Sequence, residues 1–338
     1  MKKPDPRALN PNLKFGRGII AEASKDWGEY LLITTPEVLK SVEKMLGKKP
    51  AQIYFVQTLD LTAIEPAVKE LPEAETIVGI GGGMAIDLAK FAAWKQGKEP
   101  VLVPSAASVD ASVCASIAVR NQHRVKYLGY AIAQAILCDF ALLQSAPINL
   151  NRAGIGDILS IHSALWDWNL AEKKGKGKYL EESARGTSAL VDQLEKMAGE
   201  IRVASEKALQ WLMQAYAQEN AICIRTGNSR PEEGSEHFFA YNVEYQTRRA
   251  YVHGELVCLG VVLMSRLQEN NVARVEKILK QTGVRYQPKE LGISRPELEH
   301  CLFSLKEYAE KENLVYSVIN EKPITERTVK EICKDLKS

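Results

Sequence analysis

The sequence predicts an α/β protein in two parts: an N-terminal domain with a doubly wound parallel sheet, followed by an all-α C-terminal domain. Up to about Leu150, short apolar runs alternate with helical stretches, as they do in parallel sheets. Beyond that point only helical periodicity remains. The turn residues of SAPINLN mark the expected boundary, so the predicted domains are 1–149 and 150–338.

The elements of the first domain follow from local patterns. Short apolar runs bounded by turn residues predict four strands, and the stretches after two of them predict helices. The strands are expected at Tyr30–Thr34, Gln52–Val56, Thr76–Ile80 and Val101–Val103, and the helices at Pro36–Leu46 and Met84–Trp94.

Six segments of the second domain carry apolar residues at helical spacing. They are Ile155–Leu170, Leu180–Met197, Ile201–Gln218, Glu236–Arg248, Gly254–Glu269 and Ala273–Gln281.

Composition narrows the classes of function. A net charge of +2 over 338 residues indicates neither a nucleic-acid surface nor an anionic membrane surface. No apolar stretch approaches the roughly 18 residues of a membrane span, and the N-terminus lacks the apolar core of a signal peptide. The six cysteines form no CxxC pair. We therefore expect a cytoplasmic protein that binds neither nucleic acid nor membrane.

Three consecutive glycines, Gly81–Gly83, stand between a predicted strand and a predicted helix. A phosphate group needs backbone N–H groups at close range with a helix N-terminus behind them, and glycine permits both the approach and unusual φ angles. The alternative is a tight turn with no ligand.

The next predicted strand is followed by VPSAASVDAS, which carries the hydroxyls of Ser105, Ser108 and Ser112 and the carboxylate of Asp110. Open α/β sheets bind ligands at the carboxyl ends of their strands, so this loop is a candidate binding segment. The alternative is a capped turn of small residues.

Asp157, His237 and His253 form a candidate metal site. Three such ligands with an open position are typical of catalytic Zn²⁺ or Fe²⁺. On one continuous helix the two histidines, 16 residues apart, would lie roughly 160° apart, so a shared target requires two adjacent helices. The alternatives are a helix N-cap for Asp157 and surface or core positions for the histidines.

Five blocks give the chain its resemblance to the iron-containing alcohol dehydrogenase superfamily, because they occur in its order and at about its spacing. The most similar branch is that of the sn-glycerol-1-phosphate dehydrogenases, with the glycerol dehydrogenases next. The resemblance implies a nucleotide-binding α/β domain, a helical domain and an active site in the cleft between them. The blocks, from about Thr76 to Gly260, are GIGGGMAIDLAK, VPSAASVDAS, AGIGDILS, SRPEEGSEHFF and HGELVCLG.

The resemblance also implies residue roles. Asp157, His237 and His253 fall on the three metal ligands of the family, and Asp110 falls on a residue that contacts substrate. The positions implied to bind the dinucleotide are Gly81, Gly82, Gly83, Asp87, Ser105 and Ser108.

At two positions this sequence differs from the pattern of the family it resembles. Tyr241 replaces a histidine near the substrate, and Cys114 replaces a serine that contacts the cofactor. Tyr241 remains a candidate catalytic residue, and Cys114 a candidate cofactor-binding one. For a substrate phosphate, Arg225 and Arg230 are possible anchors, or else solvated loop residues.

The expected function is a metal-dependent NAD(P)(H) oxidoreductase of a small polyol or polyol phosphate, such as the conversion of dihydroxyacetone phosphate to glycerol phosphate. The expected cofactors are NAD or NADP and one divalent metal, Zn²⁺ or Fe²⁺. The expected partners are this small-molecule substrate and further copies of the chain. The alternatives are a lyase similar to 3-dehydroquinate synthase, suggested by VDASV at 109–113, and a non-catalytic homologue that binds nucleotide.

Overall fold

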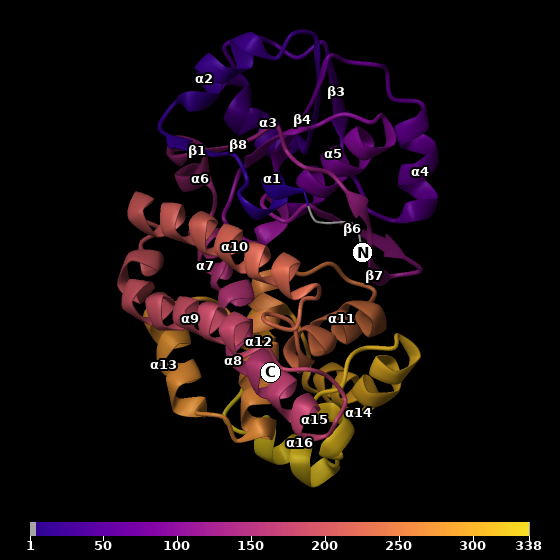
Figure 1. The fold of residues 1–338 in the computed structure, drawn as a ribbon, viewed down its shortest axis with the longest axis vertical. Helices are drawn as coiled ribbons and strands as arrows, with labels where there is room; N and C mark the ends of the chain where they lie inside the picture. Colours follow the sequence, from indigo (N-terminus) through magenta and orange to yellow (C-terminus); the bar gives the residue numbers. More distant parts are fainter. Residues whose placement is uncertain (1–4, 338) are drawn as a thin grey trace. The chain divides into compact units, whose positions relative to one another are not determined.

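The computed structural model describes residues 5–337, which divide into two compact units (Figure 1). The first unit contains the residues up to 151 together with 204–220, and the second contains 152–203 and the residues from 221 onward. These units are defined by internal contacts. The domain boundary expected between residues 149 and 150 stays a prediction.

The first unit is built on a six-stranded parallel sheet in the order β1-β8-β5-β4-β2-β3. After β2 the chain adds β3 on one side and β4 on the other, so the winding reverses there, and the predicted doubly wound parallel sheet is confirmed. The strands are β1 (Leu13–Gly16), β2 (Tyr30–Thr34), β3 (Gln52–Phe55), β4 (Thr76–Gly81), β5 (Val101–Pro104) and β8 (Ala135–Asp139).

Short helices connect these strands, and α5 packs against β2, β4 and β5. On the sheet face opposite α5, alternate residues of four strands build an apolar core, because successive side chains of a strand point to opposite faces. This core includes Tyr30, Leu32, Val78, Ile80, Val101, Val103 and Leu137. The helices are α1 (Pro6–Leu9), α2 (Ile19–Ala23), α3 (Pro36–Val42), α4 (Leu61–Lys69), α5 (Gly83–Lys95) and α6 (Phe140–Ser145).

Four strands were not predicted. β1 is short and largely half-buried, so it carries no alternation. β8 lies inside a longer apolar run, from which a buried strand and a buried helix cannot be told apart by periodicity. The other two, β6 (Ser116–Asn121) and β7 (Arg124–Tyr130), form an antiparallel hairpin. Its turn residues Gln122 and His123 both have positive φ, as a two-residue hairpin turn requires.

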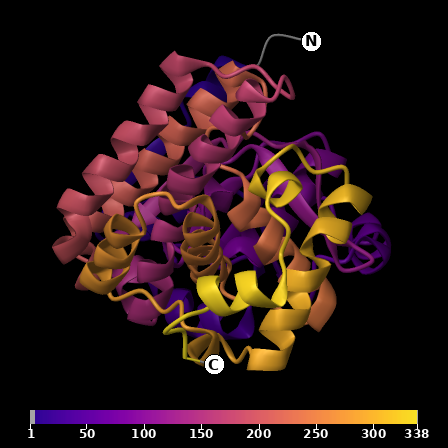
Figure 2. The ribbon, with the colours of Figure 1, turned by 90° about the horizontal axis from the view of Figure 1, so that it is seen from below.

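Among the described residues of the second unit the regular secondary structure is helical, with loops between the helices, which confirms the predicted all-α region. Figures 1 and 2 show α8 and α12 inside it and the yellow C-terminal helices at its periphery. α7 and α10 each continue from the first unit into the second. The helices are α7 (Ile148–Ala153), α8 (Ile155–Lys173), α9 (Glu181–Arg202), α10 (Glu206–Thr226), α11 (Ser235–Thr247), α12 (His253–Gln268), α13 (Val272–Thr282), α14 (Arg295–Lys311), α15 (Val318–Glu321) and α16 (Glu326–Ile332).

Several helix boundaries were predicted wrongly: α3 ends at Val42 rather than Leu46, and α10 ends at Thr226 rather than Gln218. α9 continues to Arg202, whereas the sequence pattern placed its end at Met197 and the next start at Ile201. The break comes at Ala204, which has a φ of +48°. The hydroxyl of Ser205 then accepts a hydrogen bond from the backbone N–H of Ala208, so this serine caps α10. A serine before EKAL was a local signal of that start.

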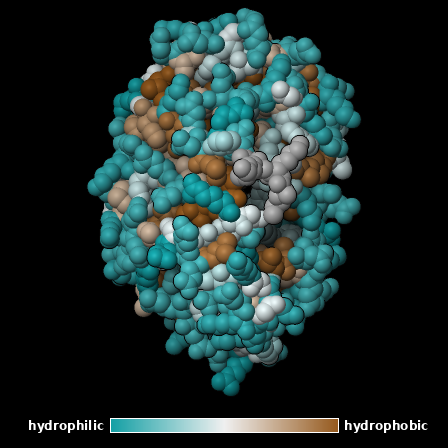
Figure 3. All heavy atoms as spheres, in the orientation of Figure 1, coloured by the Kyte–Doolittle hydropathy of each residue, from teal (hydrophilic) through white to brown (hydrophobic). Residues whose placement is uncertain are grey.

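On the face drawn in Figure 3, hydrophilic residues predominate and apolar side chains occur in small groups. The edge strand β3 exposes Ile53 and Phe55. Among residues 5–337, no helix has the length and apolar character needed to cross a membrane.

Glycines allow three helices of the second unit to approach closely. A Cβ on Gly156 of α8 would lie 2.5 Å from the Cα of Gly254 on α12. A Cβ on Gly260 of α12 would lie 2.5 Å from the backbone oxygen of Glu236 on α11. Since the obstructing atoms are backbone, neither contact can be relieved by turning a side chain. Glycine at these positions therefore sets how near α8, α11 and α12 come to one another.

We expect Gly156→Ala to destabilise the protein by about 1–3 kcal/mol, because the added methyl group must push α8 away from α12. The control is Gly199→Ala on α9, where a Cβ would have no atom within 4 Å. That change should be neutral or stabilise by about 0.5–1 kcal/mol through helix propensity. Denaturant unfolding monitored by circular dichroism measures both. Equal midpoints for the two variants would contradict the role of the helix crossing.

Candidate active site

The second unit brings together the three predicted metal ligands. Asp157 lies in the first turn of α8, His237 in the first turn of α11, and His253 at the start of α12. The histidine ring centroids are 5.4 Å apart, and Nε2 of His253 lies 3.6 Å from Oδ1 of Asp157. The two histidines therefore sit on adjacent helices with a bend between them, as a shared target requires.

The geometry of this donor set fits a divalent cation. One ligand atom from each of the three residues lies within 4.8 Å of the other two. Oxygen and nitrogen ligands bind Zn²⁺ at about 2.0–2.2 Å, which separates neighbouring ligand atoms by roughly 3.4 Å in a tetrahedral site. Small side-chain rotations are enough to reach that spacing. Asp157 and His237 are buried and His253 is partly exposed, so one side of the set remains open.

Glu236 is a residue of this site that the sequence reasoning missed. It is fully buried, and its Oε1 lies 3.0 Å from Nδ1 of His237. Burial lowers the pKa of His237, but the hydrogen bond to Glu236 and the charge of that carboxylate outweigh it and raise the pKa to about 9. The signal in the sequence was the acidic residue directly before the histidine in SEHFF.

A second buried acid, Asp167 on α8, lies next to this arrangement. Its two oxygens accept hydrogen bonds from the backbone N–H groups of Ser235, at 2.8 Å, and Val318, at 2.7 Å. Burial, together with the charge of Glu236, raises the pKa of the Asp167 carboxyl to about 6. Asp167 thus holds the chain at the start of α11, where two of the site residues lie.

Arg230 does not lie in a solvated loop. It is 7% exposed and donates to the backbone carbonyls of Asp167 and Tyr316. These contacts are structural and stabilise the segment before α11. Arg225, at the end of α10, is exposed.

Tyr241 lies one helical turn after His237 on α11. Its ring centroid is 5.9 Å from that of His237, and the residue is 6% exposed. The phenol is therefore close to the metal candidates, as the i, i+4 spacing predicted.

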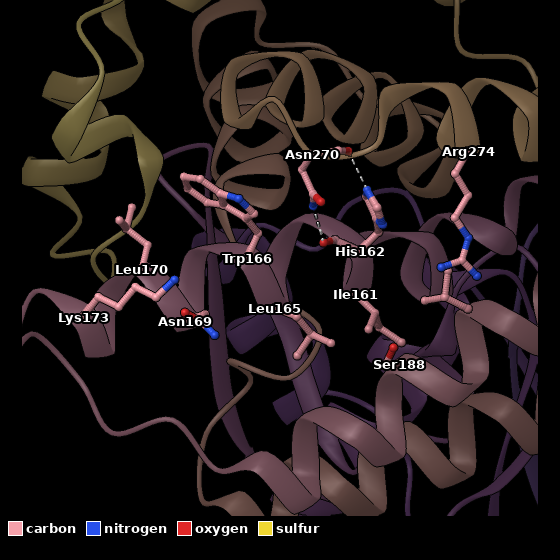
Figure 4. Close-up of a pocket in the computed structure, with 11 residues that line it drawn as sticks. Ile161, His162, Leu165, Trp166, Asn169, Leu170, Lys173, Ser188, Asn270 and Arg274 are labelled. Atoms are coloured by element: carbon pink, nitrogen blue, oxygen red, sulfur yellow. Dashed lines mark hydrogen bonds between the residues drawn. The ribbon is translucent and has the colours of Figure 1, made fainter.

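His162 takes no part in this cluster. It lines a separate pocket of about 390 Å³ in the second unit, with Trp166 and Arg274 among the other lining residues (Figure 4). Its Nε2 lies 2.9 Å from the backbone oxygen of Asn270, and the Asn270 amide donates back to the backbone oxygen of His162. Burial lowers the pKa of His162, which favours the neutral ring. These bonds account for His162 as a structural residue.

In the first unit, the glycine turn lies where the winding of the sheet reverses. Gly81 ends β4, and its backbone oxygen accepts a hydrogen bond from the N–H of Ser105, which follows β5. A Cβ on Gly83 would lie 3.4 Å from the side chain of Val109. The turn and the serine-rich loop are therefore neighbours, at the place where open α/β sheets bind ligands.

The glycines of the turn have different reasons for being glycine. A Cβ on Gly81 would lie 2.6 Å from the Cβ of Ala85, so Gly81 is needed for packing of α5 on the strand. Gly82 has an ordinary φ of −80°, and a Cβ there would meet nothing within 4 Å. None of the three glycines has a positive φ, so the unusual φ angles that glycine permits do not occur in this turn. Neither packing nor backbone conformation explains glycine at position 82.

Asp87 is buried inside the first unit. Its Oδ1 lies 2.7 Å from Nζ of Lys90 and accepts a hydrogen bond from the N–H of Ala118. Lys90 in turn donates to the backbone oxygens of Ala111, Cys114 and Ser116. This pair fixes the 110–116 segment against α5. A direct contact of Asp87 or Cys114 with a cofactor stays a prediction.

Asp110 begins the short 3₁₀ helix Asp110–Ser112 after the serine-rich loop. Its Oδ2 accepts a hydrogen bond from Nδ2 of Asn220, at 2.8 Å. Asn220 is buried. The sequence gave no signal for this contact, because Asn220 lies 110 residues further along the chain and no local pattern connects it with Asp110. Ser108 is partly buried in the same loop, and the hydroxyl of Ser112 is buried without a hydrogen bond.

Comparison with solved structures supports the fold. The chain is similar to a glycerol dehydrogenase from Schizosaccharomyces pombe, with a TM-score of 0.71 and 18% identity over 96% of this chain and 88% of that one. It is also similar to a probable glycerol dehydrogenase from Sinorhizobium meliloti, with a TM-score of 0.70 and 19% identity over 95% of both chains.

Sequence comparison gives the family. Residues 31–147 match the family model described as iron-containing alcohol dehydrogenase. The chain is 30% identical to the glycerol-1-phosphate dehydrogenase (NAD(P)+) of Sulfurisphaera tokodaii, over 79% of this chain and 78% of the relative. It is 30% identical to that of Pyrobaculum islandicum, over 82% and 84%. The chain therefore belongs to the iron-containing alcohol dehydrogenase family of oxidoreductases, in the group that contains the glycerol-1-phosphate dehydrogenases.

Proposed function

We propose that this protein is a metal-dependent glycerol-1-phosphate dehydrogenase, which interconverts dihydroxyacetone phosphate and sn-glycerol 1-phosphate with NAD(P)(H). The observation that carries the proposal is the convergence of Asp157, His237 and His253 in a chain whose relatives bear that name. The decisive experiment is to mix the metal-loaded protein with NADH or NADPH and dihydroxyacetone phosphate, and to follow the loss of absorbance of the reduced cofactor. No loss with either cofactor would refute it.

The divalent metal would be held by Asp157, His237 and His253. We propose that it is Zn²⁺, and Fe²⁺ is the alternative because the same oxygen and nitrogen ligands also bind it. Such an ion acts as a Lewis acid on a substrate oxygen, while the nicotinamide cofactor carries the hydride. The chain itself supplies alignment: α8, α11 and α12 hold the three ligand side chains in place before substrate arrives.

Gly81–Gly83 and the start of α5 would receive the cofactor pyrophosphate. The N–H groups of a first helical turn have no partner within their helix and carry partial positive charge, so they favour a phosphate. Open space at Gly82 supports this role. Ser105 and Ser108 lie in the neighbouring loop as further donors. The choice between NAD and NADP is left to the assay with both cofactors.

Asp110 and Tyr241 are the proposed substrate contacts. The Asp110 carboxylate is held by Asn220, so it can accept hydrogen bonds from substrate hydroxyls in a fixed position. The Tyr241 hydroxyl can donate a hydrogen bond or pass on a proton, although a phenol is a weaker base than imidazole.

The alternatives differ in turnover. A lyase similar to 3-dehydroquinate synthase would leave its NAD unchanged overall, and a non-catalytic homologue would bind nucleotide without turnover. The relatives named as dehydrogenases favour the oxidoreductase.

We also propose a homo-oligomer in the cytoplasm. Light scattering of the purified protein tests the first point, and imaging of a fluorescent fusion in the native cell tests the second.

Metal binding is predicted to need all three ligands. The protein should bind about one Zn²⁺ or Fe²⁺ per chain, and Asp157→Ala, His237→Ala or His253→Ala should each abolish most of that occupancy, since two ligands hold the ion poorly. Elemental analysis after gel filtration measures it. The control is His300→Ala, because His300 is an exposed residue of α14 outside the three-residue cluster. Full occupancy in His253→Ala would refute the ligand assignment.

Cofactor binding is predicted to depend on position 82. Gly82→Val should raise the dissociation constant for NAD(P)H at least tenfold, about 1.4 kcal/mol, because its side chain would occupy the path of the pyrophosphate. Its unfolding midpoint should match the wild type, since the backbone suits valine and a Cβ meets nothing. Fluorescence titration gives the affinity. An unchanged dissociation constant would exclude the turn as the phosphate site.

Substrate preference is predicted to depend on position 241. Tyr241→His should raise kcat/KM for dihydroxyacetone phosphate relative to dihydroxyacetone by about tenfold, or about 1.4 kcal/mol, because an imidazolium attracts phosphate and a phenol does not. Kinetics with both ketones at one pH give the ratio. If the ratio does not move, Tyr241 does not select the substrate.

A further inference from the structure

Glu236 connects a metal-ligand candidate to a second ligand-bearing helix. Its Oε1 accepts a hydrogen bond from the N–H of Gly234, at 2.6 Å, and faces Nδ1 of His237 at 3.0 Å. Its Oε2 accepts a hydrogen bond from the hydroxyl of Ser163 on α8, at 2.8 Å. Glu236 and Ser163 are both fully buried. Every one of these contacts lies inside the second unit.

These contacts determine which nitrogen of His237 carries hydrogen. Because Oε1 already accepts from the N–H of Gly234, it faces the ring as an acceptor. The ring then carries hydrogen on Nδ1, so Nε2 is the nitrogen that can give up its proton and present a lone pair. A metal ligand must present a lone pair, so His237 is arranged to bind through Nε2.

The same carboxylate fixes the orientation of the ring. Ser163 lies six residues after Asp157 on α8, and its bond to Glu236 ties that helix to α11. Gln268 at the end of α12 donates to the backbone oxygen of Ser163, at 3.1 Å. The three helices that carry the ligand candidates are therefore joined by hydrogen bonds that meet at Ser163.

We propose that Glu236 is a positioning residue, which holds His237 as the Nδ1–H tautomer with Nε2 directed at the metal. The proposal rests on the ligand set proposed above and adds to it a residue that does not touch the ion. Groups that hold a ligating histidine in this way commonly change metal affinity by about 10–100-fold when they are removed.

The test compares two replacements of similar size. Glu236→Gln keeps an acceptor toward Gly234 and His237, and its amide can donate to the Ser163 hydroxyl, which can turn to Ser160, whose backbone oxygen is 3.1 Å away. Glu236→Met offers no acceptor. We expect Glu236→Met to weaken Zn²⁺ binding by about 10–100-fold in competition with a chromophoric chelator, and Glu236→Gln to recover most of that loss.

A second readout needs no metal. The chain has five histidines, so selective ¹⁵N labelling and nitrogen–proton correlation spectra of the metal-free protein, recorded above the His237 pKa of about 9 where the ring is neutral, can report the tautomer of His237, identified from the signal missing in His237→Ala. We expect the Nδ1–H form in the wild type and in Glu236→Gln, and loss of that preference in Glu236→Met.

The control is Glu255→Met, which removes another buried carboxylate from the second unit, one whose oxygens bind Arg285. It should lower stability without changing the His237 tautomer. Wild-type affinity and tautomer in Glu236→Met, or an equal loss of affinity in Glu255→Met, would overturn the proposal. His237→Ala separates the two ideas, because retained metal there would refute the ligand set itself.

Discussion

The close approach of α8 and α12 is the constraint on which the site depends. Gly156 and Gly254 meet backbone to backbone, and each directly adjoins a ligand candidate, Asp157 and His253. The 3.6 Å separation between those two side chains follows from this contact. A helix crossing with larger side chains has an interaxial distance of up to about 10 Å, which would hold the carboxylate and the imidazole apart. Two glycines thus act on the geometry of the site without touching it.

The electrostatic character of the site comes from buried acids. Asp157, Asp167 and Glu236 are all buried in the second unit, whereas the buried guanidinium of Arg230 donates to backbone carbonyls. Buried carboxylates are costly unless hydrogen bonds or cations compensate them. Asp167 and Glu236 receive several backbone and hydroxyl hydrogen bonds, and a divalent cation would complete the compensation for Asp157. The folded chain therefore prepares a negatively charged place before any ion binds.

The proposed anion site of the first unit is formed by different means. The reversal of winding beside β2 leaves the end of β4 open, and the turn at Gly81–Gly83 leads directly into α5. Lys90, fully buried, holds the 110–116 segment against that helix through three backbone oxygens. The two candidate sites thus differ in their donors: the proposed cation site uses side chains of converging helices, and the proposed anion site uses backbone at a strand end.

The sequence by itself determined the parallel sheet and the helical second part, because these are encoded in local periodicity. It also nominated the residues of both candidate sites, through short blocks that resemble those of a known family. Only the tertiary structure decided which residues hold the side chains of the candidate sites in position. Glu236 meets Ser163 across 73 residues, and Asn220 meets Asp110 across 110. Hydrophobic periodicity cannot predict such pairs, because it does not show which distant residue a single buried polar side chain contacts. The reason for glycine at 156 also appeared only with its neighbours in place, because a Cβ there would meet the backbone of Gly254.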